Sequence, residues 1–259
     1  MSVNHPIEPP LLVKELRDLR LPSFVEHWSR TADEAKRRGG SYAEYLAELV
    51  HHEVHDRSER RIRRRIQEAR FPRLKTLDTF DFDYQPGLDR DVVLDLARGR
   101  FIDEQANVIL IGEIGTGKTH LATAIALACC QREYRVRFLT AVDLTNMLVE
   151  SKSVDKLSRK LDQMARYDLV VLDELGYVPF DRIGADLLFT FITKVYERRS
   201  LIVTTNLPFG RLSEVFIDET AAAVIDRIVH HSTILQTTGK SYRLQAAEKA
   251  HKEGAGEAG

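Results

Sequence analysis

The sequence predicts an α/β fold in which helices cover both faces of a parallel sheet, preceded by a small helical domain. From residue 107 onward, short apolar runs alternate with longer segments of helical periodicity, a pattern typical of parallel sheets. The first eighty residues show helical spacing of apolar side chains and no such runs. A chain of 259 residues is also long enough for one large domain with a smaller appendage.

Three parts are expected along the chain. They are a helical domain, an α/β domain and a flexible tail, at residues 1–75, 76–245 and 246–259. In the helical domain, Ser41 and Glu44 form a capping-box pattern that begins a helix, and Pro72 ends the helical stretch that follows. The tail is small, charged and glycine-containing, so we expect it to fray.

In the α/β domain, strands buried on both faces should be short and apolar throughout. Four runs fit this description, at Val108–Ile111, Val136–Leu139, Leu169–Leu172 and Leu201–Thr204. Helical stretches are expected between them, near residues 119–131, 142–166 and 184–198.

Composition indicates a folded protein in a reducing compartment. Hydrophobic residues make up 43% of the chain and charged residues 30%, which is ordinary for a globular domain. The longest apolar stretch, Leu121 to Cys130, is far too short to cross a bilayer, and the N-terminus lacks a signal-peptide pattern. Cys129 has only its neighbour Cys130 as a second cysteine. We therefore expect a cytoplasmic protein without a membrane partner, with both thiols packed inside a helix.

One segment of the chain has the form of a Walker A phosphate loop. It consists of Gly112, Glu113, Ile114, Gly115, Thr116, Gly117, Lys118 and Thr119. An apolar strand precedes it and a run of helix formers follows, which a chance glycine-rich turn would not require. Glycines let successive main-chain N–H groups point at a phosphate, and the helix N-terminus adds its positive dipole end. Lys118 is expected to reach the β- and γ-phosphates of ATP, and the Thr119 hydroxyl to bind Mg²⁺.

A second motif, of Walker B form, follows in the apolar run Leu169-Val-Val-Leu-Asp173-Glu174. A parallel strand delivers Asp173 to its carboxyl end, beside the phosphate loop and Mg²⁺. The adjacent Glu174 is expected to orient the water that attacks the γ-phosphate, although an exposed turn acid would look the same. A small-molecule kinase needs no such acid, so the pair favours hydrolysis over phosphoryl transfer.

The next strand candidate, LIVTT, ends at Asn206. An amide at this strand tip is well placed to position the attacking water or to touch the γ-phosphate. Taken alone, Thr-Thr-Asn is equally typical of a strand-ending turn. Its place after the Walker B motif favours a sensor residue.

These motifs together resemble a known family. GEIGTGKTHLA, LVVLDELGYVPF, LIVTTN and GKSYRL are similar to segments of the IstB-like AAA+ ATPases, helpers of a bacterial insertion-sequence transposase that are related to DnaC-type helicase loaders. The resemblance covers nearly the whole chain and implies a P-loop NTPase fold of the AAA+ kind. It also implies that Asn206 is sensor 1, that Arg227 is an arginine finger acting on a neighbour's ATP, and that Arg243 contacts nucleotide or a neighbouring subunit.

The resemblance further implies a homo-oligomer that assembles with ATP on duplex DNA, without strong sequence preference, and that recruits and stimulates a transposase. The segment from Arg57 to Lys75 contains nine basic residues and two acidic ones, a charge that would favour binding to a polyanion. Such a run is, however, more often a solvent-exposed helix face without a partner. The candidate DNA contacts in it are Arg57, Arg60, Arg61, Arg64 and Arg65. A second basic cluster comprises Lys152, Lys156, Arg159 and Lys160.

Three other functions stay open at this point. A helicase loader would grip a replicative helicase through its N-terminal region and favour single strands. A small-molecule phosphotransferase would need a lid and an acceptor pocket, neither of which is visible in the sequence. A nucleotide-gated scaffold would bind ATP and hydrolyse it slowly, with Glu174 present but poorly aligned.

Overall fold

The protein is described here by a computed structural model, which covers residues 9–151, 153–177, 180–208, 210–211, 220–239 and 241. The chain divides into two compact units, Met1–Arg63 and Arg64–Gly259. Among the described residues, no helix has both the length and the apolar character that a membrane span requires.

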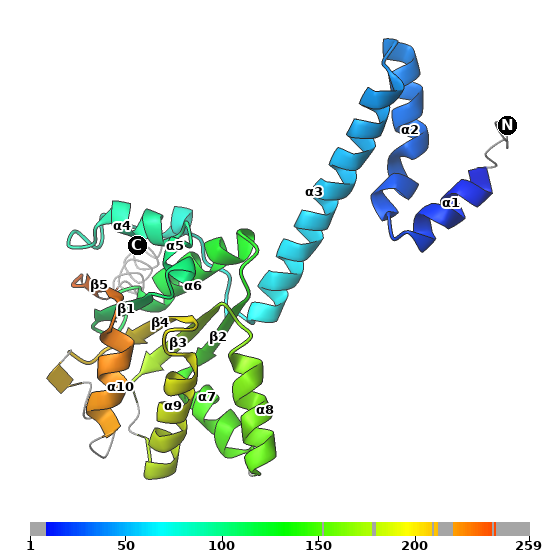
Figure 1. Cartoon of the computed structure of the whole chain (residues 1–259). Helices are drawn as coiled ribbons and strands as arrows, with labels where there is room; N and C mark the ends of the chain where they lie inside the picture. The colour runs from blue at the N-terminus through cyan, green and yellow to red at the C-terminus, as the bar shows by residue number, and fades with distance from the viewer. Residues whose placement is uncertain are drawn as a thin grey trace, which may run out of the picture. The chain divides into compact units, whose positions relative to one another are not determined.

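The N-terminal unit is helical, as the apolar spacing predicts. Its helices are α1 (Pro9–Asp18), α2 (Pro22–Arg38) and α3 (Tyr42–Ala69), of which α3 continues into the second unit (Figure 1). The predicted capping box is present at the start of α3. The Ser41 N–H donates to Glu44 Oε2 at 2.7 Å, and the Glu44 N–H donates to Ser41 Oγ at 3.2 Å. These two bonds satisfy main-chain donors that the first helical turn leaves without partners.

The second unit contains a five-stranded parallel sheet in the order β2-β3-β4-β1-β5. The strands are β1 (Asn107–Gly112), β2 (Val136–Thr140), β3 (Leu169–Leu175), β4 (Ser200–Thr205) and β5 (Ser232–Thr237). The first four contain the four predicted runs. The sequence did not predict β5, an edge strand with exposed residues and only two apolar side chains, Ile234 and Leu235.

Helices cover both faces of this sheet, as Figure 1 shows. They are η1 (Leu77–Thr79), α4 (Arg90–Leu96), α5 (Arg100–Asp103), α6 (Lys118–Gln131), α7 (Ala141–Val149), α8 (Val154–Met164), α9 (Arg182–Val195) and α10 (Thr220–Val229). The sequence predicts one helical stretch over residues 142–166, whereas α7 and α8 are separate helices. The C-cap of α7 is Glu150 and the N-cap of α8 is Ser153, so the first helix ends before the second begins.

Two cores lie on the two faces of the sheet. Successive residues of β1 alternate between them, because strand side chains point to opposite faces. Val108 packs in a core with α4, α5 and α6, and Ile109 packs in the other core with α7, α9 and α10. The α/β fold with helices on both faces is thereby confirmed. Because the strands are parallel, their carboxyl ends all lie at the same edge of the sheet.

The two cysteines lie in the core formed around α6. Cys129 and Cys130 are both fully buried, and burial raises the pKa of each thiol to about 12. Because the thiolate is the reactive form, we expect neither cysteine to react with iodoacetamide at about pH 8 while the protein is folded. Mass spectrometry should find both alkylated only after unfolding in guanidinium chloride. Rapid modification of the native chain would contradict the burial of these side chains.

Candidate nucleotide site

The phosphate loop joins β1 to α6 at the carboxyl edge of the sheet. Strand β1 ends at Gly112 and α6 begins at Lys118. Gly115 and Gly117 have φ angles of 87° and 92°, in the left-handed region that favours glycine. A side chain at Gly115 would also collide with Ser241, because the loop and the chain after β5 approach closely there. The turn therefore explains Gly115 and Gly117, whereas a side chain at Gly112 would collide with Thr237.

The Lys118 ammonium lies over this loop. Its Nζ donates to the main-chain oxygens of Gly112 and Glu113 at 2.6 and 2.7 Å. Both partners are neutral carbonyls, whereas hydrogen bonds from an ammonium to charged oxygens are shorter and stronger. Anionic phosphate oxygens placed in the loop would therefore compete well for the same donors.

Asp173 meets Thr119 across the sheet edge, although 54 positions separate them in the chain. Thr119 Oγ1 lies 3.0 Å from Oδ1 and 3.1 Å from Oδ2 of Asp173, whose side chain is buried. A hydroxyl and a carboxylate are the oxygen ligands that Mg²⁺ prefers. No group of three or more His, Cys, Asp or Glu side chains in the described part of the chain could hold a metal. The Thr119 hydroxyl and the Asp173 carboxylate fit Mg²⁺ that completes its shell with phosphate oxygens and water.

Glu174 and Asn206 are placed at this same edge. Glu174 is exposed and follows Asp173 at an irregularity of β3, where its φ angle is 61°. Left-handed backbone is uncommon for a residue with a side chain, and it costs about 1–2 kcal/mol. Asn206 follows β4, which lies between β1 and β3. Its position between the phosphate loop and the Walker B acids is the one expected for a sensor.

Sequence reasoning missed Thr237 and His120 at this site. The buried Thr237 bonds through its Oγ1 to Thr116 Oγ1 at 2.7 Å, and donates to the main-chain oxygen of Ile111 at 3.3 Å. It thereby ties the end of β5 to the phosphate loop. The signal that could have found it is its place just before the GKSYR segment.

His120 is the second missed residue, and it directly follows the Walker A threonine. Its Nε2 lies 3.0 Å from the Thr76 main-chain oxygen, and its ring packs edge-on against Phe80. Burial lowers the pKa of this imidazole, and the nearby Lys75 charge lowers it further, although the Thr76 contact opposes the shift. His120 thus holds the segment before η1 against the beginning of α6.

Arg227 lies near the start of β1, whereas the phosphate loop follows the end of that strand. Asn107, at the start of β1, donates through Nδ2 to the main-chain oxygens of Ile228 at 3.1 Å and Arg227 at 3.5 Å. Strand β1 then runs six residues to Gly112, a rise of about 16 Å. The Arg227 guanidinium is 5.0 Å from the Phe189 ring centroid and 5.9 Å from that of Tyr196. The structure therefore does not bring Arg227 to the site of its own chain.

The candidate DNA contacts on α3 differ in their exposure to solvent and in their ion pairs. Arg57 donates to Glu53 Oε1 at 2.6 Å, and Arg60 lies 3.7 Å from the same oxygen. Arg64 is 66% exposed and pairs with Glu68 at 3.4 Å, and Arg61 is also exposed. The Arg64 side chain is thus more exposed than those of Arg57 and Arg60, which are each 48% exposed.

Arg65 departs from the expected exposed basic face. Its side chain is only 12% exposed and lies 3.6 Å from Glu68. The reason is its place on the side of α3 that also carries the buried Ala69 and the partly buried Ile66. In the second cluster, Lys156 and Arg159 are exposed on α8 and Lys160 is partly buried. Lys152 and Arg243 lie outside the described residues.

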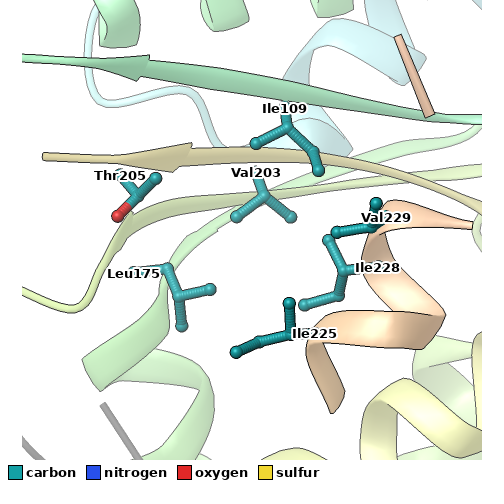
Figure 2. A pocket seen from close by; sticks show the side chains of 7 residues that line it. All are labelled: Ile109, Leu175, Val203, Thr205, Ile225, Ile228 and Val229. Carbon is teal, nitrogen blue, oxygen red and sulfur yellow. The ribbon is translucent and has the colours of Figure 1, made fainter. Parts of the chain in front are cut away.

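An apolar pocket lies on the other side of the sheet from α6, beneath α10 (Figure 2). Its lining side chains are Ile109, Leu175, Val203, Thr205, Ile225, Ile228 and Val229. Thr205 supplies the only polar side chain of this lining, so the pocket offers nothing to bind a triphosphate. The candidate nucleotide site is the sheet edge built by the phosphate loop and Asp173.

Comparison with known proteins agrees with this geometry. A family model described as IstB-like ATP binding protein matches residues 14–250. An ATP-binding protein of insertion sequence IS21 from Pseudomonas aeruginosa is 38% identical over 236 residues, which cover 91% of this chain and 89% of the relative. An insertion sequence ATP-binding protein from Sinorhizobium fredii is 37% identical over 253 residues, covering 97% of this chain and 85% of that protein.

Solved structures show the same fold. The crystal structure of DnaI superposes with a TM-score of 0.52 at 23% identity, and the match covers 64% of this chain and 89% of DnaI. At this identity the likeness concerns the fold alone. Together with the parallel sheet and the phosphate loop, it identifies the fold as the AAA+ form of the P-loop NTPases. The chain belongs to the IstB-like ATP-binding proteins, a family associated with insertion sequences.

Proposed function

We propose that this chain is an ATPase that assembles as a homo-oligomer on duplex DNA and recruits and stimulates the transposase of its insertion sequence. The observation that carries the proposal is the meeting of Lys118, Thr119 and Asp173 at one edge of the sheet, with Glu174 beside them. ATP and Mg²⁺ are the proposed cofactors. The family membership and the insertion-sequence relatives support the role in transposition.

In the proposed reaction, the phosphate loop holds the triphosphate through its main-chain N–H groups and Lys118. Thr119 and Asp173 would hold Mg²⁺, which supplies charge neutralisation on the phosphate oxygens. Glu174 orients a water molecule whose oxygen forms the new bond to the γ-phosphorus. The bond from that phosphorus to the β–γ bridging oxygen breaks, so the products are ADP and phosphate. Asn206 helps to position the attacking water.

Arg227 is proposed to act on a neighbouring copy of the chain. Its distance from its own phosphate loop excludes a role there, since the two lie at opposite ends of β1. Opposite edges of one subunit can meet when identical subunits associate head to tail. An arginine supplied in this way would neutralise the charge that develops on the γ-phosphate.

DNA binding is proposed to rest on the N-terminal helical domain, residues 1–75, through the exposed arginines of α3. We expect the double variant Arg61→Gln/Arg64→Gln to bind duplex DNA more weakly, because arginines that neutralise phosphates release counterions. The slope of log affinity against log salt should fall by about 0.9 for each phosphate that is no longer neutralised. Fluorescence anisotropy at several salt concentrations measures both quantities.

The matched control is Arg30→Gln/Arg37→Gln on α2, which removes the same charge from another helix. If both double variants bound DNA as the wild type does, the DNA site would have to lie elsewhere, with α8 the next candidate. The same assay separates duplex from single-stranded DNA. Preference for single strands, with no stimulation of a transposase, would favour a helicase loader instead.

The proposal as a whole is tested by measuring ATP turnover with and without duplex DNA and transposase. We expect Mg²⁺-dependent hydrolysis that DNA stimulates. Turnover indifferent to DNA, with phosphate passed to a small acceptor, would support a phosphotransferase. Tight ATP binding without turnover would support a nucleotide-gated scaffold.

A further inference from the structure

Thr204 is a buried residue near the carboxyl end of β4. Its side chain is 1% exposed, and it lies opposite the two Walker B acids. Leu172 pairs with Val203 and Leu175 pairs with Thr205, so two residues of β3 face the single residue Thr204. This two-against-one arrangement is a β-bulge, a device that redirects side chains near active sites.

The Thr204 hydroxyl uses both of its hydrogen-bonding capacities within this bulge. Its Oγ1 donates to Asp173 Oδ1 and accepts from the Glu174 main-chain N–H at 2.9 Å. A regular parallel ladder pairs strand N–H groups with main-chain carbonyls, whereas here a side-chain oxygen accepts. One buried oxygen therefore fixes the carboxylate of one acid and the backbone of the next.

The backbone of Glu174 requires such support. Its φ angle of 61° lies in the left-handed region, which a residue with a side chain adopts only when its surroundings impose it. The bond from the Glu174 N–H to Thr204 holds the residue in this conformation. The direction of its side chain follows from that backbone, because the bulge sets where the Cα–Cβ bond points.

We propose that Thr204 is a positioning residue for ATP hydrolysis, holding Asp173 and Glu174 in the arrangement that the reaction needs. This inference rests on the proposed ATPase function. Thr119 and Thr204 hold the Asp173 carboxylate from α6 and from β4, so the carboxylate that would bind Mg²⁺ is oriented from two elements. Valine in place of Thr204 keeps the branched shape and removes both hydrogen bonds.

The test compares Thr204→Val, Thr204→Ser and Thr145→Val with the wild-type chain. Thr145 is a matched control, since its buried hydroxyl donates to the Ala141 main-chain oxygen at 2.8 Å, within its own helix. We expect kcat of the Thr204→Val protein to fall about tenfold to 100-fold, with KM for ATP changed less than twofold. Thr204→Ser should restore most of the rate, and the control should keep it.

A merely structural role would lower thermal stability and affinity together and would not be rescued selectively by serine. Turnover of Thr204→Val within twofold of wild type, or a serine variant as slow as the valine variant, would overturn the inference. If the valine variant does not fold, Thr204→Cys takes its place with the same expectations, because a thiol is only a weak donor and acceptor. A wild-type chain without any ATPase activity would overturn the proposed function itself.

Discussion

Replacing Lys118 with alanine should abolish ATP binding and, with it, assembly on DNA. The ammonium is the only positive side chain of the eight-residue phosphate loop, and it lies over that loop at hydrogen-bonding distance from two of its carbonyls. Hydrogen bonds to charged groups contribute about 1.5–3 kcal/mol each. Without such bonds to two phosphates, ATP binding should weaken by at least about 100-fold. Titration calorimetry with a non-hydrolysable ATP analogue measures the change.

Lys194→Ala is a suitable control for this experiment. Lys194 lies on α9 and pairs with Asp162 at 2.8 Å, away from the phosphate loop. Its removal should leave nucleotide affinity unchanged. A Lys118→Ala protein that still bound Mg²⁺-ATP at wild-type affinity would show that the loop is not the nucleotide site, and the proposed function would fall with it.

Replacing Glu174 with glutamine should stop hydrolysis while leaving ATP binding intact. Glutamine keeps the shape of the side chain but cannot accept a proton from the attacking water. General-base catalysis contributes about 10²–10⁴-fold, so kcat should fall by that factor. Oligomers formed with ATP should then persist on duplex DNA, because the step that converts ATP to ADP is blocked. Phosphate-release kinetics and electron microscopy of DNA complexes check the two effects.

The control is Glu150→Gln, at an exposed position after α7. It changes the same charge without touching the sheet edge, and its turnover should equal that of the wild type. Normal hydrolysis by the Glu174→Gln protein would mean that another group orients the water. Asn206, which follows the neighbouring strand β4, would be the next candidate.

The sequence predicted what depends on local pattern. The strands that are buried on both faces appear as apolar runs, and the capping box of α3 is recognisable from Ser41 and Glu44. Strand β5 was not predicted, because buried and exposed residues alternate along it and it therefore lacks a continuous apolar run. The break between α7 and α8 was not predicted because apolar residues recur at helical spacing on both sides of the short polar stretch at residues 150–153.

Within the site, the motifs were visible and the supporting hydrogen bonds were not. Thr204 and Asp173 are joined across 31 positions, and Thr116 and Thr237 across 121, so only the folded sheet brings them together. The left-handed backbone of Glu174 has no sequence signal, because glutamate rarely adopts it. Arg65 was predicted to be an exposed DNA contact, but its side chain is largely buried. A run of arginines indicates charge, whereas the packing of α3 determines which of them reach solvent.

Asn107 helps to hold α10, the helix that carries Arg227, against the start of β1. Its amide group accepts from the Leu201 N–H at 3.0 Å and donates to the Ile228 oxygen at 3.1 Å, joining β4 and α10 at the start of β1. If Arg227 serves a neighbour's ATP, a change at Asn107 would impair the adjacent copy while sparing the pocket of the chain that carries it. In a mixed oligomer, the impaired ATP site would then belong to the unaltered neighbour of each altered subunit.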